Sequence, residues 1–374
     1  MVSSRGTWRS SQGSPRCLGA VSGFLLKLIR ESAGLTQIQL AEQLGVDVAS
    51  VQGWESGRRP LTALRAADLA RLRSRLLRCG AQPSLLAMLA DAIQADLIIA
   101  QAVQAGSQPI TAHEHPLGAA VHQRPLTNLI TWPLTGLAPD SLRDLVTARA
   151  RRGPVPDQPT LTHDERTRFF DHLLVTADTK PQDDTALARR QAIYLLSFDP
   201  RADTADWLRT ERRRTLHAAW RTEHVPSWVA IRDSASGLAQ GGDRDPLRAF
   251  LRHGLTTEQL EQANLNYWAH WVGEIDDVQV DHKFIVHINP RDWDGTRLLR
   301  HLVNHLDPGC GYAELRIHAV WTLLLAHPAL LSNNPDLRFS VASAVERLDA
   351  DHKLSPEARR ELSDMAYGVR LADQ

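Results

Sequence analysis

The side chains whose types and spacing best fit a chemical site lie near the C-terminus. His301 and His305 are four residues apart, a spacing that places both imidazoles on one face of a helix. Glu314 and His318 repeat this spacing on the next predicted helix, and Cys310 lies between the two pairs. Imidazole, thiolate and carboxylate are the groups that bind Zn²⁺ in proteins. Two such helices packed antiparallel could present a zinc site, and the alternative is ordinary hydrogen bonding at the surface or between helices.

The motifs of catalysis are missing from this sequence. Zinc peptidases with a His pair at this spacing need Glu directly after the first His as a general base, and here that residue is Leu302. The glycines at 237, 241 and 242 lack the Lys and the following helix of a phosphate-binding loop, and no GxSxG sequence presents a nucleophilic serine. We therefore expect no enzymatic activity, no cofactor and no bound metal. A metal-dependent enzyme is kept as an alternative hypothesis, which stoichiometric zinc would favour.

Charge is distributed unevenly along a chain whose formal net charge is zero. Residues 1–80 contain twelve Lys and Arg against five Asp and Glu, whereas residues 81–374 contain 31 against 38. This asymmetry concentrates attraction for phosphate in the N-terminal segment. Three unpaired, widely spaced cysteines fit a reducing cytoplasm, and no stretch approaches the ~18 uninterrupted apolar residues of a membrane helix, so we expect no membrane association.

Three short helices joined by tight turns are predicted within this basic segment. The first runs from about 24 to 32, the second begins after Thr36 as its N-cap, and the third runs from about 48 to 56. Ala41 is small enough for two helices to cross closely, Gly45 permits the positive φ of a tight turn, and Val51 fills the angle between the helices. These spacings favour a helix pair whose second member lies in a DNA major groove ~12 Å wide.

This segment resembles the phage-repressor helix-turn-helix family, also called Cro/CI or XRE. The resemblance covers about 55 of the 374 residues. The matching residues are Thr36-Gln37, Leu40-Ala41, Leu44-Gly45-Val46, Ser50-Val51, Trp54-Glu55 and Gly57-Arg58-Arg59-Pro60.

The resemblance implies a role for each matching position. Thr36 and Gln37 would lie at the N-terminus of the second helix, where donors meet a phosphate. The start and outward face of the recognition helix would consist of Val48, Ala49, Ser50, Gln52 and Gly53. Arg58 and Arg59 would bind the DNA backbone, and Arg30 and Glu55 would form a partly buried ion pair between the first and third helices. These last two residues are therefore assigned to structure.

The outward face departs from the usual family pattern in one respect. Val48, Ala49 and Gly53 are small or apolar, which leaves Ser50 and Gln52 as the polar side chains able to recognise base edges. Such a module would depend more on backbone contacts and DNA shape. A following helix, at about 64–79, contains five arginines that serve either as further phosphate contacts or as a solvated face.

The remainder of the chain is predicted to be helical, so the fold class is all-α with a helical bundle or repeat-like body. Helices are expected at about 84–105, 163–174, 185–197, 204–222, 246–253, 257–271, 295–306, 312–327, 335–349 and from 356 onward, with one weak strand at 278–288. The expected domains are a disordered basic tail at 1–22, the helix-turn-helix domain at 23–80, a helix and linker at 81–135, and an all-α C-terminal domain at 136–374.

These features predict a sequence-specific transcriptional regulator that binds double-stranded DNA. We expect it to be cytoplasmic and nucleoid-associated, and to act as a homodimer because one small module contacts too little DNA for useful specificity. The C-terminal domain would provide the dimer interface, a protein-partner surface or a small-molecule effector pocket. The alternative is a protein-interaction adaptor whose helical body carries the function and whose N-terminal module is an anchor.

Overall fold

The computed structural model describes residues 19–110, 115–147, 157–179, 186–216, 225–277, 279 and 281–372. Every regular element among these residues is a helix, which confirms the predicted all-α class. The chain divides into two compact units, Met1–Asp199 (unit 1) and Pro200–Gln374 (unit 2). The predicted tail lies outside the described residues as far as position 18, and α1 begins at Ala20.

Unit 1 begins with four helices that match the predicted N-terminal module. A short 3₁₀ turn, η1 (Leu61–Ala63), precedes the fourth of them. The four helices and the long helix that follows are α1 (Ala20–Ser32), α2 (Gln37–Leu44), α3 (Val48–Glu55), α4 (Ala66–Arg78) and α5 (Pro83–Ala105).

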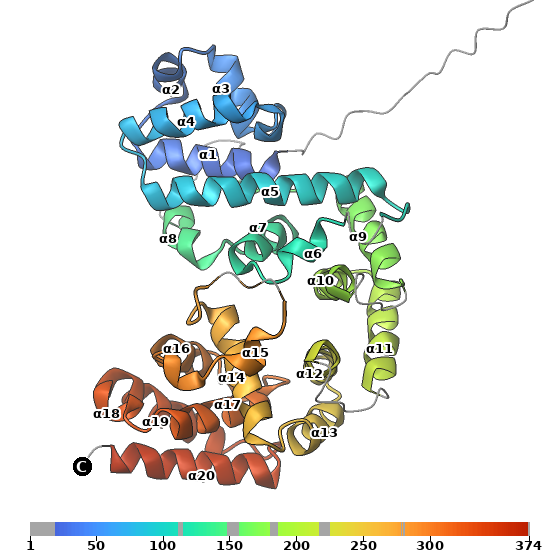
Figure 1. Cartoon of the computed structure of the whole chain (residues 1–374), viewed down its shortest axis with the longest axis vertical. Helices are drawn as coiled ribbons and strands as arrows, with labels where there is room; N and C mark the ends of the chain where they lie inside the picture. Colours follow the sequence, from blue (N-terminus) through green and yellow to red (C-terminus); the bar gives the residue numbers. More distant parts are fainter. Residues whose placement is uncertain are drawn as a thin grey trace, which may run out of the picture. The chain divides into compact units, whose positions relative to one another are not determined.

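Helix α1 is the centre of this unit. Nine of its thirteen residues are buried, so it lacks the polar face of a surface helix. It packs against α3 on one side and against α5 and α7 (Arg124–Thr135) on another. Figure 1 shows α1 between the α2–α4 group and α5. Phe24 on α1 meets Trp132 on α7 edge to face, with ring centroids 5.3 Å apart. The helix-turn-helix module therefore shares its core with the helices that follow it.

The segment predicted as a linker, 106–135, is largely helical where it is described. Helix α6 (Leu117–Ala120) follows Pro116, and α7 has Pro125 in its first turn. Proline is favoured at the start of a helix, where its missing N–H costs no hydrogen bond. These two prolines therefore mark the N-terminal ends of α6 and α7. The predicted boundary at residue 135 falls inside unit 1, which continues through α8 (Asp140–Thr147), α9 (His163–Ala177) and α10 (Ala186–Leu196).

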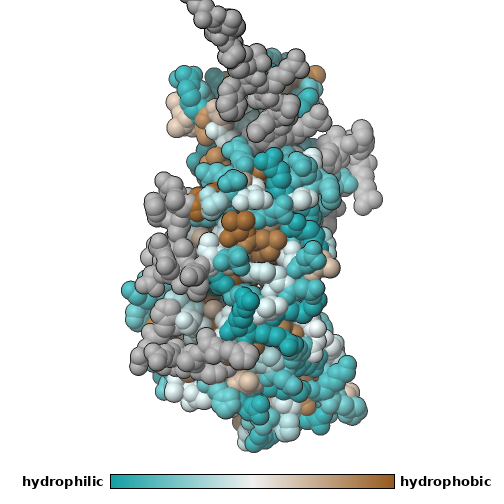
Figure 2. Space-filling model, turned by 90° about the vertical axis from the view of Figure 1, so that its right-hand side faces the viewer, coloured by the Kyte–Doolittle hydropathy of each residue, from teal (hydrophilic) through white to brown (hydrophobic). Residues whose placement is uncertain are grey.

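Helix α5 is long and apolar enough to cross a membrane by length and composition. Half of its most apolar window is buried within the protein, against α1, α7 and α9. A core helix of a globular protein has these same properties, and we interpret α5 as the core helix of unit 1. The face of the molecule in Figure 2 is mostly hydrophilic, with small groups of hydrophobic residues.

Unit 2 is a second helical assembly with two hydrophobic clusters. One is formed mainly by α14, α16, α17, α19 and α20, and the other mainly by α12, α13 and α14. The helices of this unit are α11 (Ala202–Leu216), α12 (Val225–Gln240), α13 (Asp245–His253), α14 (Glu258–Val272), α15 (Phe284–His287), α16 (Thr296–Asn304), α17 (Ala313–Ala326), α18 (Leu330–Asn333), α19 (Pro335–Asp349) and α20 (Pro356–Leu371), with a 3₁₀ turn, η3, at Pro290–Asp292.

The predicted strand at 278–288 was wrong where the structure describes it. Residues 284–287 form the single helical turn α15, and Val278 and Val280 lie outside the described residues. Buried Asn266 on α14 donates hydrogen bonds to the carbonyls of Ile285 (3.0 Å) and Ile288 (2.6 Å). This distant amide satisfies carbonyls that a strand would have paired in a sheet, and the local alternation of apolar residues could not predict it.

Candidate nucleic-acid interface

The turn between α2 and α3 is defined by local capping interactions. Thr36 and Gln39 form a capping box, in which the Thr36 hydroxyl accepts from the Gln39 N–H at 3.2 Å and the Gln39 amide oxygen accepts from the Thr36 N–H at 2.8 Å. Gly45 ends α2 with φ +69°, a left-handed conformation that favours glycine. The predicted N-cap and turn are both confirmed.

A close approach of α1 to α3 depends on Gly23. A Cβ at this position would overlap the carbonyl oxygen of Trp54 at the end of α3. The contact could not be predicted from the sequence, because a glycine within a predicted helix is also compatible with a merely weakened helix.

Arg30 and Glu55 form the predicted ion pair between α1 and α3. Arg30 Nε donates to Glu55 Oε1 at 2.5 Å and Nη2 donates to Oε2 at 3.0 Å, with only 9% and 3% of the two side chains exposed. Arg30 Nη1 also donates to the Leu35 carbonyl at 2.7 Å, before α2. Burial opposes the charge on Arg30, but its bonds to Glu55 outweigh this effect and raise the pKa of the guanidinium. The pair ties α1 to α3 and to the segment that precedes α2.

Gln37 extends this network from α2. Its side-chain Nε2 donates to Glu55 Oε2 at 2.8 Å, so one of its hydrogen-bonding groups is used within the protein. The resemblance implied that Gln37 meets a DNA phosphate. The structure places it at the N-terminus of α2 as expected and shows that Glu55 orients its amide group.

The outward face of α3 contains only part of the predicted set. Ala49 and Gln52 are exposed, and Val48 and Ser50 are half-buried. Gly53 is buried beneath Arg59, whose Cδ would be 3.0 Å from a Cβ at position 53. Gly53 is thus a packing position in this structure rather than part of an open face.

The two arginines after α3 are exposed and held by serines. Arg59 Nη1 donates to Ser50 Oγ at 2.9 Å, and Arg58 Nε donates to Ser56 Oγ at 3.1 Å. Because the Arg59 guanidinium lies beside Ser50 on the recognition helix, these two side chains would meet DNA as one group. Both hydrogen bonds are exposed, so phosphate could replace either serine at small cost.

Asp47 is a further residue at this surface, and it was not among the predicted DNA-binding residues. It is the N-cap of α3, and its Oδ1 accepts from the Ser50 N–H at 2.5 Å. Hydrogen bonds from Ser50, together with the charge of Arg59, hold the pKa of Asp47 below its usual range. An ionised carboxylate at the start of the recognition helix repels phosphate and can accept a hydrogen bond from cytosine N4. An Asp directly before a predicted helix is a common N-cap, so this role of Asp47 could have been predicted from the sequence.

The arginines of α4 have different roles. Arg75 donates to the carbonyls of Leu44 and Gln43 and so caps the end of α2. Arg65 and Arg71 both pair with Asp68 on the solvent side. In the part of the chain that the structure describes, Arg73 and Arg78 are the exposed arginines of α4 without an ion-pair partner.

The N-terminus of α1 is capped from outside the module. Its N-cap residue, Gly19, has no capping side chain, and Asp96 of α5 accepts from the backbone N–H groups of Val21 (2.9 Å) and Ser22 (2.8 Å). Only 1% of Asp96 is exposed. Burial raises the pKa of Asp96 to about 7 against the lowering effect of these hydrogen bonds. This carboxyl group joins the DNA-binding module to α5.

The candidate zinc ligands in unit 2 have other partners. Glu314 accepts from Arg248 Nη2 at 2.9 Å, and His318 lies between Glu361 (2.7 Å from Nδ1) and Glu261 (2.8 Å from Nε2). The rings of His301 and His305 lie against each other at a tilt of 38°, with centroids 4.5 Å apart. Over the described ranges, no group of three or more His, Cys, Asp and Glu could hold a metal ion.

Comparison with known proteins locates one similarity. Residues 26–72 match the helix-turn-helix family model. No curated protein and no solved structure matches the chain. The match covers α2, α3 and about half of α1 and of α4, the elements whose capping, ion pair and turn are described above. Residues 26–72 are therefore a DNA-binding helix-turn-helix domain of the phage-repressor, or XRE, type.

Proposed function

We propose that this chain is a transcriptional regulator that binds a specific double-stranded DNA sequence as a homodimer. In this proposal it acts in the cytoplasm, associated with the nucleoid, and catalyses no reaction. The observation that carries the proposal is the outward face of α3, where Ala49 and Gln52 are exposed and Arg59 donates a hydrogen bond to Ser50. The Arg30–Glu55 pair holds this helix against α1. A rigid helix with polar and cationic groups on its exposed side fits a major groove.

The homodimer follows from the small size of this surface. Few side chains on α3 can reach base edges, and each good contact is worth only ~1–3 kcal/mol. Two copies on one face of the duplex double the number of contacts and demand half-sites ~34 Å apart. The other helices would supply the dimer contacts, a protein-partner surface or an effector pocket.

The test is selection from a random DNA library with the full-length protein at two salt concentrations. We expect an enriched inverted repeat with half-sites about one helical turn apart. Gln52→Ala should change the enriched sequence, whereas Gln101→Ala, an exposed glutamine of α5, should leave it unchanged. A single half-site without symmetry would contradict the homodimer.

A protein-interaction adaptor is the second candidate, and one observation favours it. Ile38 on α2 is 58% exposed, so the module carries an apolar side chain that a partner protein could cover. In that case the DNA selection would enrich no motif, and binding would disappear at modest salt because it rests on phosphate attraction alone.

A further inference from the structure

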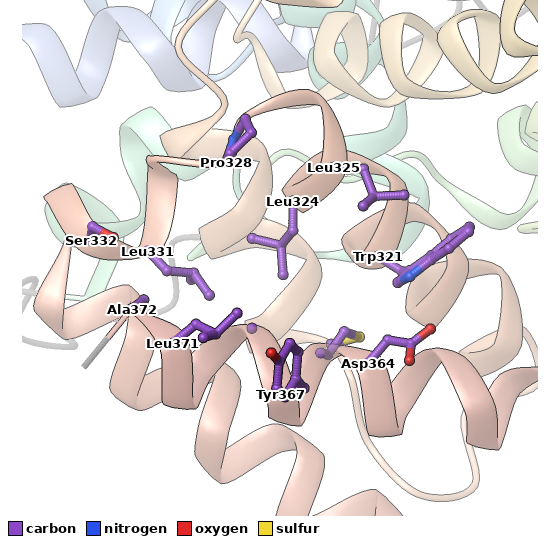
Figure 3. Close-up of a pocket in the computed structure, with 12 residues that line it drawn as sticks. Trp321, Leu324, Leu325, Pro328, Leu331, Ser332, Asp364, Tyr367, Leu371 and Ala372 are labelled. Carbon is purple, nitrogen blue, oxygen red and sulfur yellow. The ribbon is translucent and has the colours of Figure 1, made fainter. Parts of the chain in front are cut away.

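A groove in unit 2 has the size of a small-molecule site. It is bounded by α17, by α18 with Pro328 before it, and by α20, and its volume is about 470 Å³. Figure 3 shows Leu324 and Leu331 above α20, with Tyr367 and Leu371 on that helix below them. Pockets of ~300–1,000 Å³ with mostly apolar linings are typical of sites for organic ligands.

One charged side chain lines this otherwise largely apolar groove. Asp364 on α20 is exposed, and among the described residues none forms a hydrogen bond or ion pair with its carboxylate. Figure 3 places Asp364 on the α20 side, below Trp321 of α17. A carboxylate at the edge of an apolar surface selects an occupant that is apolar and positively charged.

Two aromatic rings line the groove, Trp321 from α17 and Tyr367 from α20. The negative face of a Trp or Tyr ring attracts a cation within ~6 Å of its centroid. The guanidinium of Arg370 already lies 6.0 Å from the centroid of the Tyr367 ring, and its charge opposes a second cation there, so the attraction for a cation comes mainly from Trp321 and Asp364. Next to Trp321, His318 is hydrogen-bonded to both Glu261 and Glu361, and two carboxylates around one imidazole leave this cluster no excess of positive charge.

The groove also leaves apolar surface and space that the chain itself does not fill. Leu325 is 60% exposed, Tyr367 58% and Leu371 50%, and all three line it. Gly368, in the last turn of α20, has no heavy atom within 4 Å of where a Cβ would lie. A helix-interior glycine costs stability, and no intramolecular neighbour requires one here. Its absent side chain leaves room for an occupant.

We propose that this groove binds a hydrophobic organic cation. Its apolar part contacts Leu324, Leu325 and Leu331, and its charge lies at Asp364 beside the rings of Trp321 and Tyr367. The site lies wholly within unit 2. The proposal goes beyond DNA binding and does not depend on it, since binding of the cation is measured on the protein alone.

The test is equilibrium dialysis of the full-length protein against tetraphenylphosphonium and, separately, against tetraphenylborate. These two ions have nearly the same size and apolar surface and opposite charge, so their comparison isolates the sign of the charge. We expect the cation to bind at one site per chain, and the anion to bind at least tenfold more weakly. Equal retention of both ions would overturn the proposal, as would no retention of the cation.

Two matched variants place the cation in the groove. Asp364→Asn keeps the shape of the side chain and removes its charge, and should weaken binding of the cation about fivefold. Asp349→Asn removes an exposed carboxylate at the end of α19, outside the groove, and should not change binding. An unchanged affinity in Asp364→Asn would show that the cation binds elsewhere and overturn the assignment.

A second copy of the chain is the competing occupant. Sedimentation velocity of the wild type and of Leu325→Glu, without added cation, separates the two cases. The proposal expects the same oligomeric state in both proteins. Conversion of a dimer to a monomer by Leu325→Glu would show that another subunit covers the groove, and would overturn the proposal of a small-molecule site. The DNA selection described above is independent of all these outcomes.

Discussion

The carboxylate of Asp96 on α5 accepts a hydrogen bond from the backbone N–H of Ser22 at 2.8 Å, across 74 positions of sequence. Backbone N–H groups in the first turn of a helix have no partner within the helix. Asp96 satisfies those of α1 because no side chain at Gly19 can do so. The first helix of the DNA-binding module thus depends on a residue outside the matched family segment.

The first prediction concerns the pH dependence of stability that Asp96 causes. Its pKa is raised to about 7 in the folded protein, above the value of 3.8 for an unperturbed Asp. Its contribution to the free energy of unfolding is therefore fully present below about pH 4 and is lost as the pH rises through about 7. Urea denaturation at pH 5 and pH 8 should show a larger loss of stability in the wild type than in Asp96→Asn.

The comparison with Asp96→Asn also removes the effect of other titrating groups. His115 and His172 have lowered pKa values through burial and oppose the trend of Asp96 at acid pH, but they are present in both proteins. Equal losses of stability in the two proteins would contradict the prediction. Asp96→Ala should destabilise the protein further, on the order of 1–3 kcal/mol, because two buried N–H groups lose their acceptor.

Interactions between residues close in the sequence could be predicted, and interactions between residues far apart in the sequence could not. The N-cap at Thr36 and the turn at Gly45 depend on residues a few positions apart, and the sequence pattern located both. Asp96 with Ser22, and Asn266 with Ile285, join helices that only the tertiary fold brings together. The same holds for His318, whose partners Glu261 and Glu361 lie on two other helices.

Some residues also have surroundings in the fold that differ from those their residue type suggested. Gly53 occupies the position that the family resemblance gives to an outward-facing residue, yet the side chain of Arg59 covers it. A linker was expected within 81–135, yet Pro116 and Pro125 lie there at the starts of the helices α6 and α7. In both cases the residue type was compatible with two environments, and contacts made elsewhere in the fold decided between them.

The second prediction concerns the buried pair of Arg30 and Glu55. Arg30→Ala leaves Glu55 buried without its cation, and removing one member of such a pair costs about 3–5 kcal/mol. The melting temperature, followed by circular dichroism, should fall by several degrees. Arg65→Ala is the matched control, because it breaks an ion pair whose Arg is 85% exposed and should change stability by less than ~1 kcal/mol. Equal effects of the two substitutions would show that the Arg30 pair is not a structural element.

The third prediction concerns the contact between Gly23 and Trp54. Gly23→Ala inserts a Cβ where the Trp54 carbonyl oxygen lies, so α1 and α3 must move apart. The substitution should lower the melting temperature, although alanine is the better helix former. Gly368→Ala, in open space on α20, should instead raise stability by about 0.5–1 kcal/mol. A neutral or stabilising Gly23→Ala would mean that the two helices can separate at little cost.

The fourth prediction separates base recognition from backbone contact. Gln52→Ala should change the preferred base at one position of each half-site, at a cost of ~1–3 kcal/mol for the preferred sequence. Arg58→Ala should weaken binding to all sequences alike and reduce the slope of log K against log salt by about 1. Fluorescence anisotropy with the selected DNA and with scrambled DNA, at several salt concentrations, measures both effects. The same loss on both DNAs in Gln52→Ala would exclude this residue from base recognition.

The fifth prediction concerns His318 and alkaline pH. Burial alone would lower the pKa of His318, but its hydrogen bonds to Glu261 and Glu361 outweigh burial and raise the pKa to about 9. A basic group with a folded-state pKa above its usual 6.5 contributes stability that is fully present below about pH 6.5 and is lost as the pH rises through about 9. The free energy of unfolding should therefore fall between pH 6.5 and pH 9.5 in the wild type. His318→Gln cannot carry the proton, so its stability should fall less over this range. His352→Gln removes an exposed histidine and should retain the wild-type profile. If His318→Gln also keeps that profile, the imidazole is not the group whose charge links α14, α17 and α20.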